Sequence, residues 1–364
     1  MKETFPLTRC SPFPECHFSL QKKRHHYTHF LIGLLPRSLA FHRFSLGYTA
    51  ANMTRPIPGL TEEELAAFNR DGYLIIKNAL LPETVSDMMK ETQHLLSSFS
   101  VEDHPLTRFS TGTKSEHVGD DYFLTSGDKI RFFFEEDAFD DDGKLTKPKE
   151  KAVNKIGHNL HGLSEPFKKL LDEQGAVSRG EVAPAAVARA LGYRDPRCLQ
   201  SMVICKQPEI GGAVPPHQDS TFLYTNTPSA VGFWYALEDA TLENGCLSFL
   251  PGSHRWAPID KRLVRKPGDI GTEMVDNQGP RFPRGEGYGL KTSEGGLDGQ
   301  YVPGEVKAGD LVLIHGNLLH KSEKNTSQKG RIIYTYHVIE GEGCQYDKRN
   351  WLQPSQGGFT RLYA

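Results

Sequence analysis

One short stretch of the chain places a histidine and an aspartate two positions apart. In "VPPHQDSTF", residues 214–222, these are His217 and Asp219. Alternate residues of a β-strand point to the same side about 6.6 Å apart, so both can aim at one point if the strand ends there. Two imidazoles and one carboxylate on one face of a ferrous ion leave its other positions open for oxygen chemistry. The pair supplies two of these three ligands, but among 15 histidines it does not identify a metal site by itself.

The third ligand has to come from a distant part of the chain, and four later histidines are candidates. His254 follows a turn, and His315 and His337 lie in apolar runs, where we expect packed side chains. His320 stands just beyond a predicted strand, in "HGNLLHKSEKN", and Arg331 begins the next apolar run. We expect the strand of Arg331 to pair with the strand of His320. A guanidinium placed there can bind a carboxylate through two parallel hydrogen bonds.

The elements that must position these residues begin with helices. Thr61 and Glu64 form a capping-box pattern that predicts a short amphipathic helix ending near Gly72. A second helix is predicted from Pro82. Strands are predicted within residues 73–78, 126–137, 199–207, 309–316 and 331–340. Helices first and strands later, around one core, indicate a closed or sandwiched β-fold with helical buttresses.

Two features of the β-rich half are less regular. Segment 230–254 contains two apolar-rich runs divided by Asn244-Gly245, which predicts a tight hairpin because both positions tolerate positive φ. Residues 262–301 are rich in Gly, Pro and charge and show little periodicity. We interpret them as a long insertion over the β-scaffold, which together with Phe222 and Tyr224 shapes a substrate pocket.

Composition excludes several classes of protein. The net charge is −2 with no long run of one sign, which argues against a nucleic-acid partner. The six cysteines include no CxxC pair, so we expect isolated thiols in a reducing compartment. The uninterrupted apolar run Phe30–Leu35 ends at Pro36 and is too short to span a membrane.

The first 52 residues differ from the rest, with seven Lys or Arg against two acids. A mitochondrial presequence is one interpretation. We favour a disordered extension over residues 1–52, with one folded domain over 57–364 and Met53 as an alternative start. The expected location is therefore the cytoplasm, with the mitochondrion as the alternative, and the final "RLYA" is not a peroxisomal signal of the Ser-Lys-Leu type.

Longer runs of the sequence resemble a known family. "PPHQD", "GFWYALEDATLENGCLSFLPGSH" and "GDLVLIHGNLLHKSEKNTSQKGR" are similar to the phytanoyl-CoA dioxygenase family, and the likeness extends from about Leu60 to "NWLQP". "SGDKIRFFFE", "NKIGHNLH" and "QSM" resemble most closely its phytanoyl-CoA dioxygenase domain-containing branch. The resemblance implies a mainly β fold with flanking helices, built on a double-stranded β-helix, a cupin-like jelly roll.

The resemblance also implies the site residues and the cofactors. It implies Fe(II) as the metal, with 2-oxoglutarate and O2 as co-substrates. The metal ligands would be His217, Asp219 and His320, and the co-substrate would contact Arg331, Ser322, Lys155, Met202 and Trp234. Without the resemblance, Lys155 would be interpreted as a solvated lysine, and Met202 and Trp234 as core residues.

The implied reaction is hydroxylation of a small organic or lipid-like substrate, with oxidative decarboxylation of 2-oxoglutarate to succinate and CO2. Related halogenases replace the carboxylate ligand with a small residue, so Asp219 favours hydroxylation. Two alternatives keep the scaffold: a zinc-dependent hydrolase with the same three ligands, and a non-catalytic cupin-like binding protein. We expect a small-molecule substrate, although no motif indicates which one, whether it is a CoA ester, or the oligomeric state.

Overall fold

The computed structural model describes residues 58–108, 121–283 and 300–363. The predicted extension over residues 1–52 lies outside this described part, so the domain boundary stays a prediction. The described helices are α1 (Glu62–Asp71), α2 (Pro82–Ser98), α3 (Asp121–Leu124), α4 (Leu160–Leu163), α5 (Glu165–Lys169), α6 (Glu173–Arg179) and α7 (Pro184–Ala190). None of them is long and apolar enough to cross a membrane.

The first helix forms where its capping pattern predicts. The Thr61 side chain accepts from the Glu64 backbone N–H at 3.2 Å, and the Glu64 carboxylate accepts from the Thr61 N–H at 2.9 Å. Gly72 ends α1 with a φ of +81°, a conformation that glycine adopts at little cost. Helix α2 carries Pro82 in its first turn, where a missing N–H leaves no hydrogen bond unmade.

Most of the chain between and after these helices is β-structure. The strands are β1 (Tyr73–Ile76), β2 (Ile130–Phe134), β3 (Val153–His158), β4 (Pro196–Lys206), β5 (Val214–His217), β6 (Val231–Ala236), β7 (Leu247–Phe249), β8 (Lys261–Arg265), β9 (Thr272–Asp276), β10 (Val302–Gly304), β11 (Leu311–His315), β12 (His320–Ser322), β13 (Arg331–Glu340) and β14 (Thr360–Arg361). An eight-stranded sheet has the order β1-β11-β6-β13-β4-β3-β2, with β14 beside β4. A four-stranded sheet has the order β10-β7-β12-β5.

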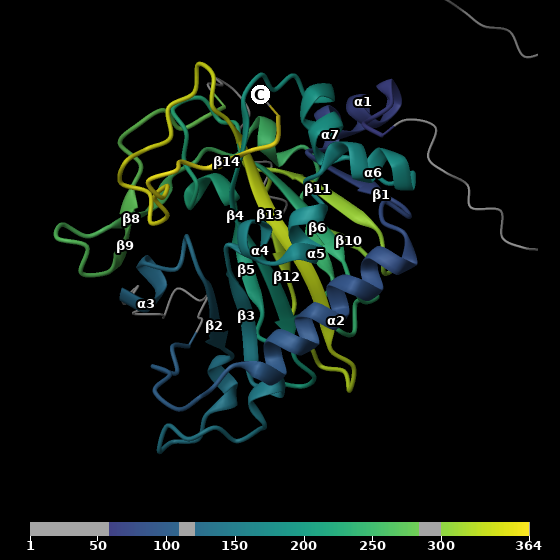
Figure 1. Ribbon diagram of the computed structural model, residues 1–364. Coiled ribbons are helices and arrows are strands. Elements are labelled where there is room, and N and C mark those ends of the chain that lie inside the picture. The colour runs from purple at the N-terminus through teal and green to yellow at the C-terminus, as the bar shows by residue number, and fades with distance from the viewer. Residues whose placement is uncertain (1–57, 109–120, 284–299, 364) are drawn as a thin grey trace, which may run out of the picture. The chain divides into compact units, whose positions relative to one another are not determined.

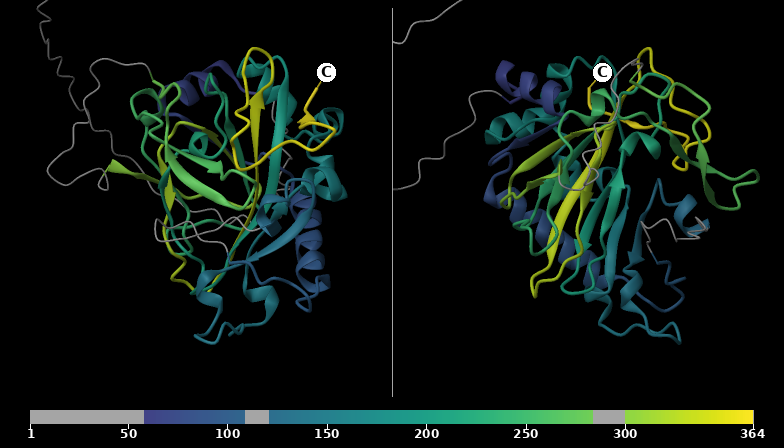
Figure 2. Two further views of the ribbon diagram at one scale, coloured as in Figure 1. Left: turned by 90° about the vertical axis from the view of Figure 1, so that its left-hand side faces the viewer. Right: turned by 180° about the vertical axis from the view of Figure 1, so that it is seen from behind.

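The two sheets and the helices form layers, and alternate side chains along a strand belong to the cores on its two sides. On β6, Phe233 and Tyr235 belong to the core between the large sheet and the helices, whereas Trp234 and Ala236 belong to the core between the sheets. Figure 1 shows α2, α4 and α5 across one face of the large sheet, and Figure 2 shows the same layers from two further sides. The predicted jelly-roll fold with flanking helices is confirmed.

The predicted hairpin at Asn244-Gly245 is wrong. Strand β6 pairs with β11 and β13 in the large sheet, whereas β7 pairs with β10 and β12 in the small one. The segment between β6 and β7 therefore crosses from one sheet to the other. Gly245 does have a positive φ, +81°, but Asn244 is not among the residues with positive φ. The dipeptide indicated a turn correctly, but a local pattern does not determine which sheet the next strand joins.

The predicted pairing of the strands of His320 and Arg331 is also wrong. Strand β12 pairs with β5 and β7, whereas β13 pairs with β4 and β6. Residues 323–330 carry the chain between the sheets, so His320 and Arg331 approach the same space from opposite layers. A jelly roll places consecutive strands in alternate sheets. The sequence interpretation instead treated the two strands as neighbours in one sheet.

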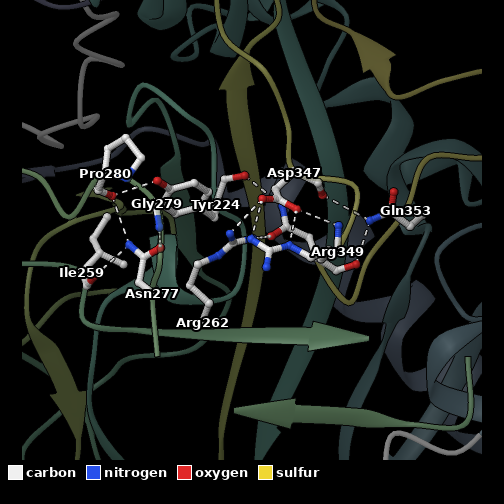
Figure 3. A network of polar contacts seen from close by, with 10 residues as sticks. Tyr224, Ile259, Arg262, Asn277, Gly279, Pro280, Asp347, Arg349 and Gln353 are labelled. Carbon is white, nitrogen blue, oxygen red and sulfur yellow. Dashed lines mark hydrogen bonds and ion pairs between the residues drawn. The ribbon is translucent and has the colours of Figure 1, made fainter. Parts of the chain in front are cut away.

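Residues 284–299 of the predicted insertion lie outside the described residues. Its start is more regular than predicted, because β8 and β9 form an antiparallel two-stranded sheet there. Arg262 of β8 is 1% exposed, and its guanidinium lies 4.0 Å from the centre of the Tyr224 ring. It donates to Asp347 at 2.8 Å and to Asn350 at 3.0 Å. Figure 3 shows this arrangement, in which the Tyr224 hydroxyl also donates to the Pro280 carbonyl at 2.8 Å. Arg262 therefore joins the insertion to the segment after Asp219 and to the C-terminal segment.

Replacing this arginine tests whether the contacts stabilise the fold. We expect Arg262→Met to lower the free energy of unfolding by about 3 kcal/mol, because it removes one member of a buried, hydrogen-bonded ion pair. The adjacent Lys261 pairs with Asp276 at the surface, so Lys261→Met should cost less than about 0.5 kcal/mol. Urea unfolding of both variants measures the difference, and equal losses would contradict this interpretation.

Candidate active site

The three predicted metal ligands meet between the two sheets. Strand β5 ends at His217, and Asp219 follows as the first residue of a 3-10 turn, Asp219–Thr221. His320 begins β12 and pairs directly with His217. The Asp219 Oδ1 atom lies 3.6 Å from His217 Nε2 and 3.8 Å from His320 Nε2. One ligand atom from each residue lies within 4.8 Å of the others, close enough for one metal ion.

The two imidazoles are held in the tautomer that a metal needs. His217 Nδ1 lies 2.9 Å from the Pro215 carbonyl, and His320 Nδ1 lies 3.0 Å from the Leu318 carbonyl. A carbonyl only accepts, so each Nδ1 carries the proton and each Nε2 keeps a free lone pair. Backbone carbonyls behind ligating histidines commonly orient the rings in this way.

His337 holds the other oxygen of the aspartate, a contact that the sequence interpretation missed. Its Nε2 lies 3.1 Å from Asp219 Oδ2, and its Nδ1 lies 3.0 Å from the side-chain nitrogen of Gln200. Donation from Gln200 to Nδ1 leaves the imidazole proton on Nε2, facing Asp219. Oδ2 is thereby occupied and Oδ1 is directed towards the two ligand histidines. His254 and His315 instead pack against each other, with ring centres 4.9 Å apart, as the sequence predicts.

The electrostatics of the cluster favour metal-ready protonation states. Burial alone would raise the pKa of Asp219, but the neighbouring imidazoles of His337, His320 and His217 outweigh it and hold that pKa well below its usual range. Burial, reinforced by His217, lowers the pKa of His320 to about 4. Asp219 is therefore ionised and His320 neutral at physiological pH, which are the forms that bind a cation.

A second group of side chains comes from the start of β13 and the end of β12. Arg331 is 3% exposed, and its Nη1 donates to the Gly245 carbonyl at 2.8 Å. Its Nε is buried and has no hydrogen-bond partner among the residues that the structure describes. The Trp234 ring centre lies 5.2 Å from the guanidinium. Burial lowers the pKa of Arg331 to about 10, so it stays charged. A buried guanidinium with an unused donor fits an anionic ligand.

The remaining predicted residues lie on neighbouring strands of the large sheet. Met202 on β4 and Trp234 on β6 both face Thr335 of β13 in the register, one on each side. Lys155 on β3 is opposite Ile204 of β4. It is 7% exposed, and burial lowers its pKa to about 7 against the opposing charge of Glu135. Lys155 is therefore buried, whereas its sequence context without the resemblance predicts a solvated lysine.

A further lysine, Lys206, was missed by the sequence interpretation. It ends β4, lies directly opposite Arg331 in the register and is 3% exposed. Its ammonium donates to the Ser322 hydroxyl at 2.9 Å and to the Glu323 carbonyl. Positions 202 and 206 are an even number apart, so the strand period places Lys206 on the same face as Met202. This even spacing in the sequence could have indicated that Lys206 belongs to the site.

Two facing sheets with two histidines and one carboxylate directed at a point between them define a jelly-roll metal centre of the kind used by non-haem iron oxygenases. A solved structure with the same fold is the apo form of EctD from S. alaskensis, at a TM-score of 0.51 and 20% identity, covering 85% of this chain and 87% of that one.

Sequence comparison identifies the family. Residues 68–333 match the model of the phytanoyl-CoA dioxygenase (PhyH) family. The chain is 41% identical to the phytanoyl-CoA dioxygenase domain-containing protein 1 homolog of Caenorhabditis briggsae over 81% of this chain and 97% of that protein. It is also 41% identical to phytanoyl-CoA dioxygenase domain-containing protein 1 of Danio rerio, over 84% of this chain and 99% of that protein.

The chain belongs to the phytanoyl-CoA dioxygenase family. It is an oxidoreductase of the dioxygenase class that depends on Fe(II) and 2-oxoglutarate and consumes O2. The family, the enzyme class and the cofactors expected from the sequence are thereby confirmed.

The contact between His337 and Asp219 leads to a prediction about metal affinity. We expect His337→Phe to weaken Fe(II) binding about tenfold, because it keeps a ring but removes the donor that orients Asp219. His315→Phe, the same change at a half-buried histidine outside the cluster, should leave Fe(II) affinity unchanged. Anaerobic titration with a competing chelator measures both, and equal affinity of the His337 variant and the unmodified protein would contradict the assigned contact.

Proposed function

We propose that the protein hydroxylates a small organic or lipid-like substrate at an iron held by His217, Asp219 and His320. The observation that carries the proposal is the cluster of these three side chains between the sheets, with Arg331 buried on the facing strand. Bound Fe(II), with 2-oxoglutarate and O2, supplies the oxidising power to insert one oxygen atom into a C–H bond, while 2-oxoglutarate becomes succinate and CO2.

The donor set suits ferrous iron. Two neutral imidazole nitrogens and one carboxylate oxygen on one side of a metal are the ligands of non-haem Fe(II) oxygenases. His337 leaves Asp219 with one free oxygen, so the carboxylate is directed to act as a monodentate ligand. The protein's part is to fix these three atoms and to leave the opposite side of the metal free for its co-substrates.

The neighbouring residues suit the distal carboxylate of 2-oxoglutarate. His320 and Ser322 are two positions apart on β12, about 6.6 Å along a strand, which is comparable to the span of an extended five-carbon dicarboxylate. We propose that Arg331 and Ser322 bind this carboxylate, with Lys155, Met202 and Trp234 lining the same space. The unused donor of Arg331 supports this assignment and gives the arginine a role that a zinc hydrolase would not need.

The surroundings of the metal ligands support an apolar substrate. The Phe222 ring lies edge-on to the His217 ring, with centres 5.9 Å apart. Phe222 packs with a buried apolar cluster that includes Leu199, Leu223 and Trp351. We propose that this cluster, with the described residues 262–283 that Tyr224 joins to it, forms the substrate side of the site, where apolar walls exclude water from the reacting bond.

A direct test loads the protein with Fe(II) anaerobically, adds 2-oxoglutarate and looks for the metal-to-ligand absorption band. Admitting O2 together with a cell extract should then release succinate and yield a metabolite that has gained one oxygen atom. We expect Asp219→Ala to reduce succinate release more than about a hundredfold, because losing a ligand costs more than losing a residue behind one. An Fe(II)-loaded protein that shows no such band with 2-oxoglutarate, while the zinc-loaded protein hydrolyses esters, would refute the proposal.

The buried lysine gives a pH dependence. Because the pKa of Lys155 is about 7, the lysine is charged below that pH and neutral above it. A dianion binds the charged form better, so 2-oxoglutarate affinity should fall as the pH rises from 7 to 9, by up to about tenfold per pH unit. Calorimetry in buffers of different ionisation enthalpy should show proton uptake on binding, and Lys155→Met should make the dependence shallower. A constant affinity over this range would exclude the assigned role.

A further inference from the structure

Lys206 is a buried cation that the family's expected site residues do not include. It faces Arg331 directly across β4 and β13, and each side chain is 3% exposed. Like charges opposite each other on adjacent strands destabilise a sheet. Arg331 accordingly lowers the pKa of Lys206, after the larger effect of burial. Two adjacent buried cations are stabilised by a nearby anion. The buried carboxylate whose charge acts on both is Glu135. Burial raises the pKa of Glu135, so its own negative charge is disfavoured.

The contacts of Lys206 determine what Ser322 can do. Burial, reinforced by Arg331, lowers the pKa of Lys206 to about 7. In its charged form a lysine has donors and no acceptor, so in the 2.9 Å contact with charged Lys206 the Ser322 oxygen accepts. The hydroxyl proton of Ser322 then points away from Lys206 and is available to donate. A second hydrogen bond, to the Glu323 carbonyl, fixes the ammonium from the same segment. Ser322 is therefore held as a donor beside a guanidinium with an unused N–H.

The neighbouring turn fits closely around this lysine. A Cβ atom on Gly245 would lie 2.9 Å from Lys206 Cδ, 3.0 Å from its Nζ and closer still to the Glu323 carbonyl oxygen. Gly245 also accepts the hydrogen bond from Arg331 Nη1. The turn that crosses between the sheets thus packs on both cations and holds them beside Ser322.

We propose that Lys206 is a positioning residue for the distal carboxylate of the co-substrate, which orients the Ser322 hydroxyl as a donor and adds a second positive charge beside Arg331. The inference rests on the proposed function and deepens it, because it states how the site selects a dicarboxylic 2-oxo acid. A 2-oxo acid with one carboxylate, such as 2-oxobutyrate, offers the same chelating end but nothing for Ser322, Arg331 and Lys206 to bind.

The test measures binding, under anaerobic conditions, of 2-oxoglutarate and of 2-oxobutyrate to Fe(II)-loaded protein by the absorption band that each 2-oxo acid produces. We expect Lys206→Met to weaken 2-oxoglutarate binding about tenfold, the effect of losing a charge-assisted hydrogen bond. Binding of 2-oxobutyrate should be unchanged, which also shows that the variant is folded. Lys206→Arg, which keeps the charge, should recover part of the loss.

A double-mutant cycle separates positioning from a general structural role. If Lys206 acts through Ser322, Lys206→Met should cost much less in a Ser322→Ala background than in the unmodified protein. If Lys206→Met does not fold, Lys206→Gln, which keeps a donor and removes the charge, replaces it throughout. Equal 2-oxoglutarate binding by the variant and the unmodified protein, or equal loss for both acids, would overturn the inference. Absence of any band in the unmodified protein would instead overturn the proposed function.

Discussion

Face-to-face packing of the four-stranded sheet on the eight-stranded sheet is the interaction on which the site depends. The three candidate metal ligands come from β5, β12 and the turn after β5, whereas the candidate co-substrate residues other than Ser322 come from strands of the large sheet. The apolar core between the layers fixes their separation, and stacked rings of Tyr73 and Phe249, 4.2 Å apart, join β1 to β7 across it. A shift of one sheet over the other would separate the two halves of the site.

Local patterns predicted local structure well. The capping box at Thr61 and Glu64 fixed the start of α1, and the apolar run from Arg331 to Glu340 is β13 to the residue. The metal ligands could be expected because His217 and Asp219 lie where a strand ends. The position of a residue within a strand depends on the strand's period and on where the strand ends, and neighbouring residues indicate both.

Partnership between strands could not be predicted in the same way. The hairpin at Asn244-Gly245 and the pairing of the strands of His320 and Arg331 both failed, because sheet membership is decided by contacts between distant segments. His337 was interpreted as a packed residue for the same reason. A histidine among apolar neighbours looks buried until it is known which face of its strand meets Asp219.

The buried charges show that the site is arranged for a ligand at some expense to the fold. Arg331, Lys155 and Lys206 are all buried, and the pKa of each is lowered mainly by burial. Glu135 is the buried carboxylate whose charge acts on all three. A dicarboxylate carries charge of the opposite sign, so binding one would offset the electrostatic cost of burying these cations.

Strand β5 is attached to the rest of the small sheet by few backbone interactions. It is the outermost strand of the small sheet, and its sequence, VPPH, includes two prolines that lack the N–H needed for a ladder. Its pairing with β12 consists of His217 with His320 and Val214 with Ser322. Ligation of one metal ion by both histidines would therefore cross-link this edge, closing a loop of 102 residues between positions 217 and 320 much as a disulfide does. Removal of iron would then loosen β5 and make it more open to proteolysis than it is in the iron-bound protein.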